Sequence, residues 1–102
     1  MIEPPHNALR SESILVVDDN ARFLSTMERL LTSTGFGSVR SVASAEDALV
    51  ALEEARPELM LVDIHLEGDE SRREDGLDLV SRLRRDGFDG TVVVVGDLAK
   101  AF

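Results

Sequence analysis

Residues 14–20 have the sequence ILVVDDN, in which an apolar run leads directly into two aspartates and an asparagine. A short continuous apolar run is typical of a parallel strand that is covered on both faces. Residues 59–63, with the sequence LMLVD, repeat this arrangement and end at Asp63. The two stretches therefore predict two buried parallel strands, each of which finishes in acidic side chains.

Asp18, Asp19 and Asp63 are expected to share one pocket. Ligands of an open parallel α/β sheet bind in the crevice beyond the carboxyl ends of its strands, where neighbouring strands would bring the carboxylates together. Like charges held so close are costly unless a cation joins them or protons are taken up. We therefore predict a site for a hard divalent metal ion and phosphate chemistry.

Helix capping is the alternative interpretation of these aspartates, because aspartate favours the N-cap position. A helix needs only one such residue, and Asn20 is available to cap the helix that follows the first strand. Asp63 is followed by the apolar residue Ile64, so it has no helix to cap. The functional interpretation is therefore preferred.

The rest of the chain alternates helical periodicity with short strand patterns. The expected strands are residues 14–17, 39–43, 59–64 and 91–95, with 39–43 near an edge of the sheet. Helices are expected after the caps Asn20 and Ser44, and a third helix is expected to bury Leu77, Val80 and Leu83. This order predicts an α/β fold: a flavodoxin-like doubly wound parallel sheet with right-handed crossovers, in which the fifth strand is missing.

Length, composition and charge narrow the class of protein. With 102 residues, the chain is expected to form one domain over residues 13–102, after a flexible leader at 1–12. A formal charge of −9 argues against nucleic acid as a direct ligand. The chain has no cysteine, no apolar run near the ~20 residues needed to span a bilayer, and no signal-peptide pattern. We expect a cytoplasmic protein without a membrane partner.

From Ile14 to about Asp97 the chain resembles the receiver domains of bacterial two-component response regulators. The resemblance rests on the stretch ILVVDDN, on Leu61-Val62-Asp63, and on Asp75-Gly76-Leu77 at the start of the third helix. It implies that Asp63 accepts a phosphoryl group from a histidine kinase or a phosphotransfer protein. Such a chain would be a phosphoacceptor, with slow loss of the phosphoryl group as its only reaction, and not a dedicated enzyme.

The same resemblance implies a Mg²⁺ site. Asp19 would be a direct ligand, Asp18 would act largely through bound water, and Asp63 and the backbone carbonyl of His65 would complete the protein ligands. Octahedral coordination by oxygen suits Mg²⁺, which also offsets repulsion among carboxylates.

The chain departs from the family pattern at several positions. Gly96 stands at the end of the fourth strand, where receivers usually carry a serine or threonine that bonds the phosphoryl group. No fifth strand with its lysine follows, and Lys100 falls too early for that role. The loop between Asp63 and Gly76 is longer than usual, and its residue His65 occupies a position that tunes dephosphorylation in this family.

These departures keep a second function open: a degenerate pseudo-receiver that acts as a phosphorylation-independent protein-interaction module. A haloacid-dehalogenase-like phosphatase is a third alternative, but Asp63-Ile64-His65 lacks the second aspartate of its Asp-x-Asp motif. Without a fifth strand, residues 92–95 would form an exposed apolar edge. We therefore expect either a fragment of a longer protein or a homodimer in which a second copy covers this edge.

Overall fold

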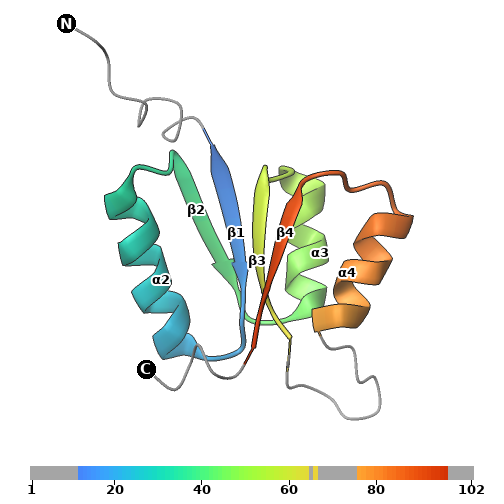
Figure 1. Ribbon diagram of the computed structural model, residues 1–102, viewed down its shortest axis with the longest axis horizontal. Helices are drawn as coiled ribbons and strands as arrows, with labels where there is room; N and C mark the ends of the chain where they lie inside the picture. The colour runs from blue at the N-terminus through green and yellow to red at the C-terminus, as the bar shows by residue number, and fades with distance from the viewer. Residues whose placement is uncertain (1–11, 65, 67–75, 97–102) are drawn as a thin grey trace, which may run out of the picture.

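The computed structural model describes residues 12–64, 66 and 76–96, which form a parallel sheet with helices on both faces (Figure 1). In chain order the elements are β1 (Ser13–Val17), α2 (Ala21–Thr34), β2 (Ser38–Val42), α3 (Ala45–Glu54), β3 (Leu59–Asp63), α4 (Gly76–Arg85) and β4 (Thr91–Val95). The four parallel strands lie in the order β2-β1-β3-β4. This is the order of a flavodoxin-like doubly wound sheet, so the predicted fold class is confirmed for the described residues.

Two strand boundaries differ by one residue from the expected ones. β2 spans Ser38–Val42 and not 39–43, because Ser38 already pairs with Ser13 of β1. β3 ends at Asp63, one residue before the expected end, because Ile64 leaves the strand towards α4. The backbone N–H of Ile64 still donates to the carbonyl of Val95, at 2.9 Å.

The main core lies between the sheet and the helices α3 and α4. Side chains of a strand alternate between its two faces, so every second residue of β1 and β3 points to this side. α3 contributes alanines, whose small side chains let the helix approach the sheet closely. The buried members of this core are Leu15, Val17, Ala45, Ala48, Ala51, Met60, Val62, Leu79, Leu83 and Phe88.

α4 buries a different face from the expected one. Leu83 is buried as predicted, but Leu77 is 52% exposed and Val80 is half-buried, while Leu79 is fully buried. Gly76, Leu79 and Leu83 follow one another at spacings of three and four, which places them on one side of the helix. Gly76 packs against the end of β3, on the same side of α4 as the buried Leu79 and Leu83.

The opposite face of the sheet is covered more thinly. Ile14 and Val16 of β1 are buried there beneath α2, which is the helix on this side in Figure 1. No residue of α2 itself is buried, and Leu30 is 54% exposed. The apolar residues Phe23, Leu24, Met27 and Leu31 of this helix are half-buried among the described residues.

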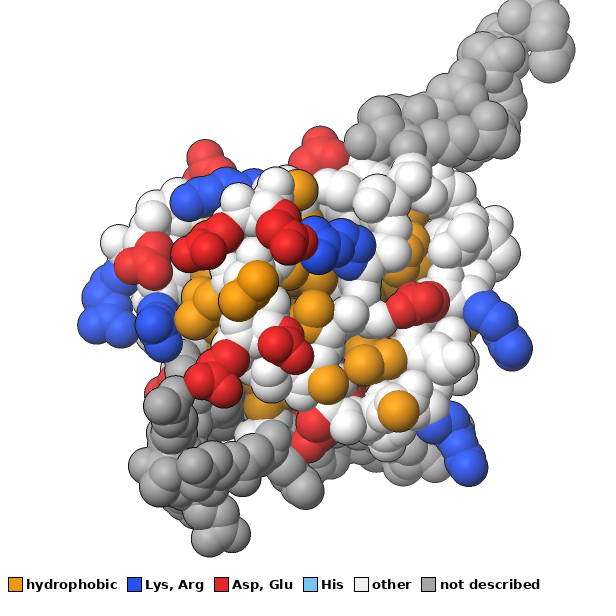
Figure 2. Space-filling model, turned by 180° about the vertical axis from the view of Figure 1, so that it is seen from behind, with side chains coloured by type: hydrophobic (Ala, Val, Ile, Leu, Met, Phe, Trp, Pro, Cys, Tyr) orange, Lys and Arg blue, Asp and Glu red, His pale blue; other side chains and the backbone are white. Residues whose placement is uncertain are grey.

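The distribution of charged side chains on the surface is consistent with the net negative charge of the chain. Figure 2 shows acidic side chains spread across the middle of the rear face, with apolar patches between them and basic side chains mainly near its margins. The described residues on this face therefore form no continuous basic surface. Within the described ranges, no helix is both long and apolar enough to cross a membrane.

Candidate functional site

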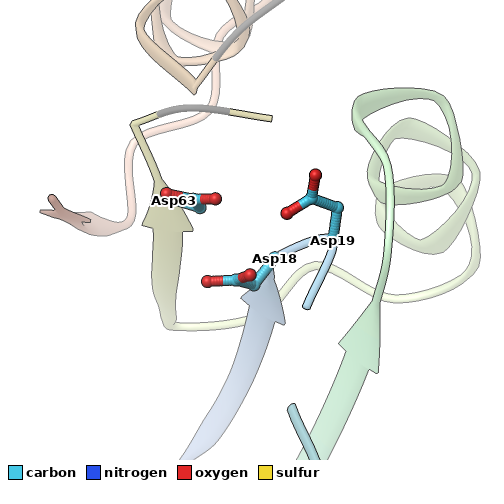
Figure 3. Close-up of side chains that lie close together, drawn as sticks. All are labelled: Asp18, Asp19 and Asp63. Atoms are coloured by element: carbon cyan, nitrogen blue, oxygen red, sulfur yellow. The ribbon is translucent and has the colours of Figure 1, made fainter. Parts of the chain in front are cut away.

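Asp18, Asp19 and Asp63 come together at the carboxyl ends of β1 and β3. One carboxylate oxygen from each side chain lies within 4.8 Å of the other two, and Figure 3 shows the three groups around the space between the strand ends. Asp18 and Asp63 are each 1% exposed, and Asp19 is half-buried. The expectation that two neighbouring strands bring these residues into one pocket is confirmed, because β1 and β3 pair directly.

The exit of β1 holds Asp18 in place. The backbone N–H of Asp18 donates to the carbonyl of Val42 at 3.1 Å, so the link to β2 continues past the end of the strand. One carboxylate oxygen of Asp18 accepts a hydrogen bond from the backbone N–H of Asn20, at 2.8 Å. The Asp18 carboxylate is thus fixed by the same turn that leads into α2.

Asn20 caps α2, as predicted. Its side-chain oxygen accepts from the backbone N–H of Phe23 at 3.0 Å, and its backbone is extended, as is usual at an N-cap. The interpretation of Asp18 and Asp19 as helix caps is therefore wrong, because Asn20 and neither aspartate is the N-cap of α2. The two aspartates stand in the crevice while the following asparagine starts the helix.

The exit of β3 is held from two sides. Asp63 pairs with Val95 of β4, and the N–H of Ile64 donates to the Val95 carbonyl. On the other side, the N–H of Gly76 donates to the carbonyl of Ile64 at 3.1 Å. The backbone that carries the Asp63 carboxylate is therefore clamped between an edge strand and the first residue of α4.

The chemistry of the cluster suits a hard divalent cation. The donors are carboxylate oxygens from three side chains, the ligand type that Mg²⁺ prefers, and the described residues add no histidine or cysteine to the group. Repulsion between carboxylates is strongest where burial lowers the effective dielectric constant. A cation among these residues would remove that repulsion, so the donor set fits Mg²⁺.

The other predicted site residues divide into two groups. Gly96 directly follows Val95, the partner of Asp63, and open space surrounds the position where a Cβ would stand. His65 lies outside the described residues, as do residues 1–11 of the predicted leader and the acidic loop 67–75. Their predicted roles stay predictions.

Gly76 is the site residue whose role the sequence analysis missed. In the sequence it is only part of the motif at the start of the third helix, whereas in the structure it packs against the backbone of Asp63. A glycine at the start of a predicted helix was the available signal. Because glycine is a poor helix former, its presence there indicates a requirement for close packing.

Comparison with known proteins agrees with this geometry. The sequence model of one family, described as the response regulator receiver domain, matches residues 14–101. The transcriptional regulatory protein AfsQ1 of Streptomyces coelicolor is 36% identical over 73 residues, which cover 72% of this chain and 30% of AfsQ1. The nitrogen assimilation regulatory protein NtrX of Azorhizobium caulinodans is 32% identical over 85 residues, which cover 83% of this chain and 18% of NtrX. The chain thus spans less than a third of each relative.

Solved structures share the fold. A CheY-like receiver domain from Methylobacillus flagellatus superposes with a TM-score of 0.74 and 26% identity, covering 89% of this chain and 74% of its own. The MaeR response regulator bound to beryllium trifluoride gives a TM-score of 0.74 at 23% identity, covering 89% of this chain and 76% of its own. The Thermotoga maritima response regulator TrrA, solved with Mg²⁺ and a beryllium fluoride, gives a TM-score of 0.74 at 22% identity. The match covers 85% of this chain and 70% of the TrrA chain.

Proposed function

Because the chain belongs to the response regulator receiver domain family, we propose that it accepts a phosphoryl group on Asp63. A histidine kinase or a phosphotransfer protein of a two-component system is the donor, and the exchange takes place in the cytoplasm. The observation that carries this proposal is the convergence of three carboxylates at the ends of the central strands β1 and β3. A metal-binding pocket around a fixed carboxylate is what such a transfer requires.

Asp18, Asp19 and Asp63 are the described residues that would hold Mg²⁺. When bound, the ion neutralises the carboxylates and stabilises the negative charge of the phosphoryl group during its transfer. Asp19 is the most accessible of the three, whereas Asp18 and Asp63 are buried. This difference suits Asp19 to the role of direct ligand, while a carboxylate oxygen of Asp63 attacks phosphorus.

Asp63 acts as the nucleophile of the transfer. One of its carboxylate oxygens forms a bond to phosphorus while the bond from phosphorus to the imidazole nitrogen of the donor breaks. The electron pair of that bond stays on the imidazole nitrogen, and the product is an acyl phosphate on Asp63. The backbone at Asp63 and Ile64 is held from both sides. The nucleophile is therefore largely positioned before the reaction, and the entropy lost on reaching the transition state is small.

The phosphoryl group stays on a side chain of the protein, so the chain acts as a phosphoacceptor and not as a dedicated enzyme. Its output then depends on contacts that change after phosphorylation.

Incubation with acetyl phosphate and Mg²⁺, followed by intact mass measurement, tests the proposal. We expect one added phosphoryl group on the wild-type chain, and none on Asp63→Asn or after Mg²⁺ is chelated. Asp47→Asn is the matched control, because Asp47 lies exposed in the first turn of α3 and should still allow labelling. Equal labelling of wild type and Asp63→Asn would contradict the proposal.

A pseudo-receiver that binds partners without phosphorylation is the second candidate, and Gly96 favours it. The residue has no hydroxyl, it is exposed, and nothing lies within 4 Å of a Cβ built on it. Beryllofluoride, a mimic of the acyl phosphate, separates the two functions. Amide NMR shifts that change only around the three aspartates would support the pseudo-receiver, whereas changes that spread to β4 and α4 would support a phosphorylation switch.

A further inference from the structure

Gly76 lies where α4 meets the backbone of Asp63. It is the first residue of the helix and is buried. A Cβ at this position would stand 1.9 Å from the carbonyl oxygen of Asp63, 2.8 Å from its carbonyl carbon and 2.9 Å from the Cα of Ile64. All three distances are below those found for real Cβ atoms, so only a hydrogen atom fits here.

Space and not backbone conformation requires glycine at this position. Among the described residues, the glycines with positive φ are Gly35, at 110°, and Gly87, at 93°, and Gly76 is not one of them. Alanine could therefore adopt the helical backbone at residue 76 and would be the better helix former. The atoms in its way belong to the backbone of β3 and its exit, which cannot rotate aside as a side chain can.

The helix cannot easily move away instead. Leu79 and Leu83, one and two turns further along α4, are 0% and 2% exposed in the main core. A close-packed core resists displacement of the side chains that fill it. On the other side, Val95 holds the same backbone through the N–H of Ile64. A larger residue at 76 would therefore displace the end of β3 by about 1 Å, the scale of misplacement that disrupts reactive geometry.

We propose that Gly76 is a positioning residue for Asp63. Its lack of a side chain lets α4 sit directly on the Asp63 carbonyl, and this contact sets the distance from the Asp63 carboxylate to those of Asp18 and Asp19. The proposal rests on the proposed function of Asp63 in phosphoryl transfer. Its consequence for Mg²⁺ binding can be measured without any phosphorylation.

The test compares Gly76→Ala with Gly87→Ala in the full chain. Gly87 follows the other end of α4, has a positive φ, and has nothing within 4 Å of a Cβ built on it. Gly87→Ala therefore strains the backbone of the same region without touching the site. Three quantities are measured: the Mg²⁺ dissociation constant of the unphosphorylated chain, the initial rate of labelling by acetyl phosphate per folded molecule, and the thermal midpoint.

We expect Gly76→Ala to weaken Mg²⁺ binding about 10-fold and to slow labelling about 100-fold, as a misplacement of about 1 Å would do. Gly87→Ala should lower the thermal midpoint but leave Mg²⁺ affinity and labelling within about twofold of wild type, because its strain lies far from the carboxylates. Wild-type Mg²⁺ affinity in folded Gly76→Ala, or equal losses in both variants, would overturn the proposal.

If Gly76→Ala does not fold in buffer, the measurements are repeated for all chains in trimethylamine N-oxide, which favours compact states. Failure to fold there, while Gly87→Ala folds, would assign Gly76 a general structural role and would also overturn the proposal. If the wild-type chain takes up no phosphoryl group, the proposed function fails. The Mg²⁺ comparison between the two variants still decides the positioning role.

Discussion

The two central strands of the sheet differ from the two outer ones in burial and in how they end. In β1 and β3 most residues are buried, whereas in the outer strands β2 and β4 none is. The central strands lead into Asp18 and Asp63, and the outer strands lead into Ala43 and Gly96. All the carboxylates of the candidate site thus lie at or just beyond the ends of strands that have a partner on each side.

This difference explains where the chemistry lies. Buried carboxylates can be held close together only on backbone that cannot relax, and a strand that is bonded on both sides and covered on both faces provides such backbone. The outer strands keep one open edge among the described residues, and Val93 and Val94 are 44% and 38% exposed. We therefore expect changes in the centre to affect stability and metal binding together, and changes at the edges to affect neither strongly.

The largest expected contrast is between Met60→Ala and Val93→Ala. Met60 of β3 is 0% exposed, so its truncation should lower the free energy of unfolding by about 2–5 kcal/mol. Val93 of β4 is 44% exposed, and its truncation should cost about 1 kcal/mol or less. Urea denaturation monitored by circular dichroism measures both values. Similar losses for the two variants would show that the edge strand is as important to the core as the central one.

Mg²⁺ should stabilise the fold through the central strands. At 100 times its dissociation constant, a ligand that binds only the folded state adds about 2.7 kcal/mol to the free energy of unfolding. We expect this gain in the wild-type chain and in Asp47→Asn, and a much smaller gain in Asp18→Asn, in calorimetry with and without Mg²⁺. Without Mg²⁺, Asp18→Asn should be at least as stable as wild type, because one of three close like charges is gone.

The edge of β4, which carries no further strand among the described residues, should support the predicted pairing of two copies. Residues 91–95 have the sequence TVVVV, with no charge to oppose contact with another strand. Val93→Lys should weaken self-association about 10-fold, which corresponds to about 1.4 kcal/mol. Light scattering over a range of concentrations measures the effect. A wild-type chain that stays monomeric at the highest concentration would remove the dimer from consideration.

The helix caps Asn20 and Ser44 allow a comparison between the end of a central strand, β1, and the end of an outer strand, β2. Asn20 caps α2 after β1, and Ser44 caps α3 after β2, where its hydroxyl accepts from the N–H of Asp47 at 3.0 Å. Asn20→Ala and Ser44→Ala should each cost about 1 kcal/mol of stability in thermal unfolding. Only Asn20→Ala should also weaken Mg²⁺ binding, because Asn20 lies in the turn that holds the Asp18 carboxylate. An equal effect of both variants on Mg²⁺ affinity would contradict the comparison.

The smallest effect should come from the ion pair between β2 and α3. Arg40 and Glu54 approach to 2.8 Å, but their side chains are 43% and 62% exposed. Exposed pairs of this kind contribute about 0–1 kcal/mol, and salt screens them. A double-mutant cycle with Arg40→Met and Glu54→Gln should therefore give a coupling below about 0.5 kcal/mol. A larger coupling that resists high salt would mean that this edge is more rigid than its exposure indicates.

Local patterns were sufficient for most of the fold. Continuous apolar runs predicted the central strands, and the alternation of strands and helices predicted the parallel sheet, because these signals depend on residues close in sequence. They did not predict the orientation of α4, where Leu79 is buried and Leu77 is exposed. Both leucines fit a helical period, and the choice between them depends on where the helix meets the end of β3.

The sequence by itself determined the class of fold, the three aspartates and the asparagine that caps the first helix, because each follows from neighbours along the chain. The sequence also predicted that the strands ending in these aspartates are neighbours, but only the tertiary structure decided their register and the 4.8 Å within which one carboxylate oxygen of each residue lies. The same holds for Gly76, whose contact with Asp63 joins two segments through a space that only a hydrogen atom can occupy. Distances between segments depend on how the whole chain packs, and no stretch of residues carries that information alone.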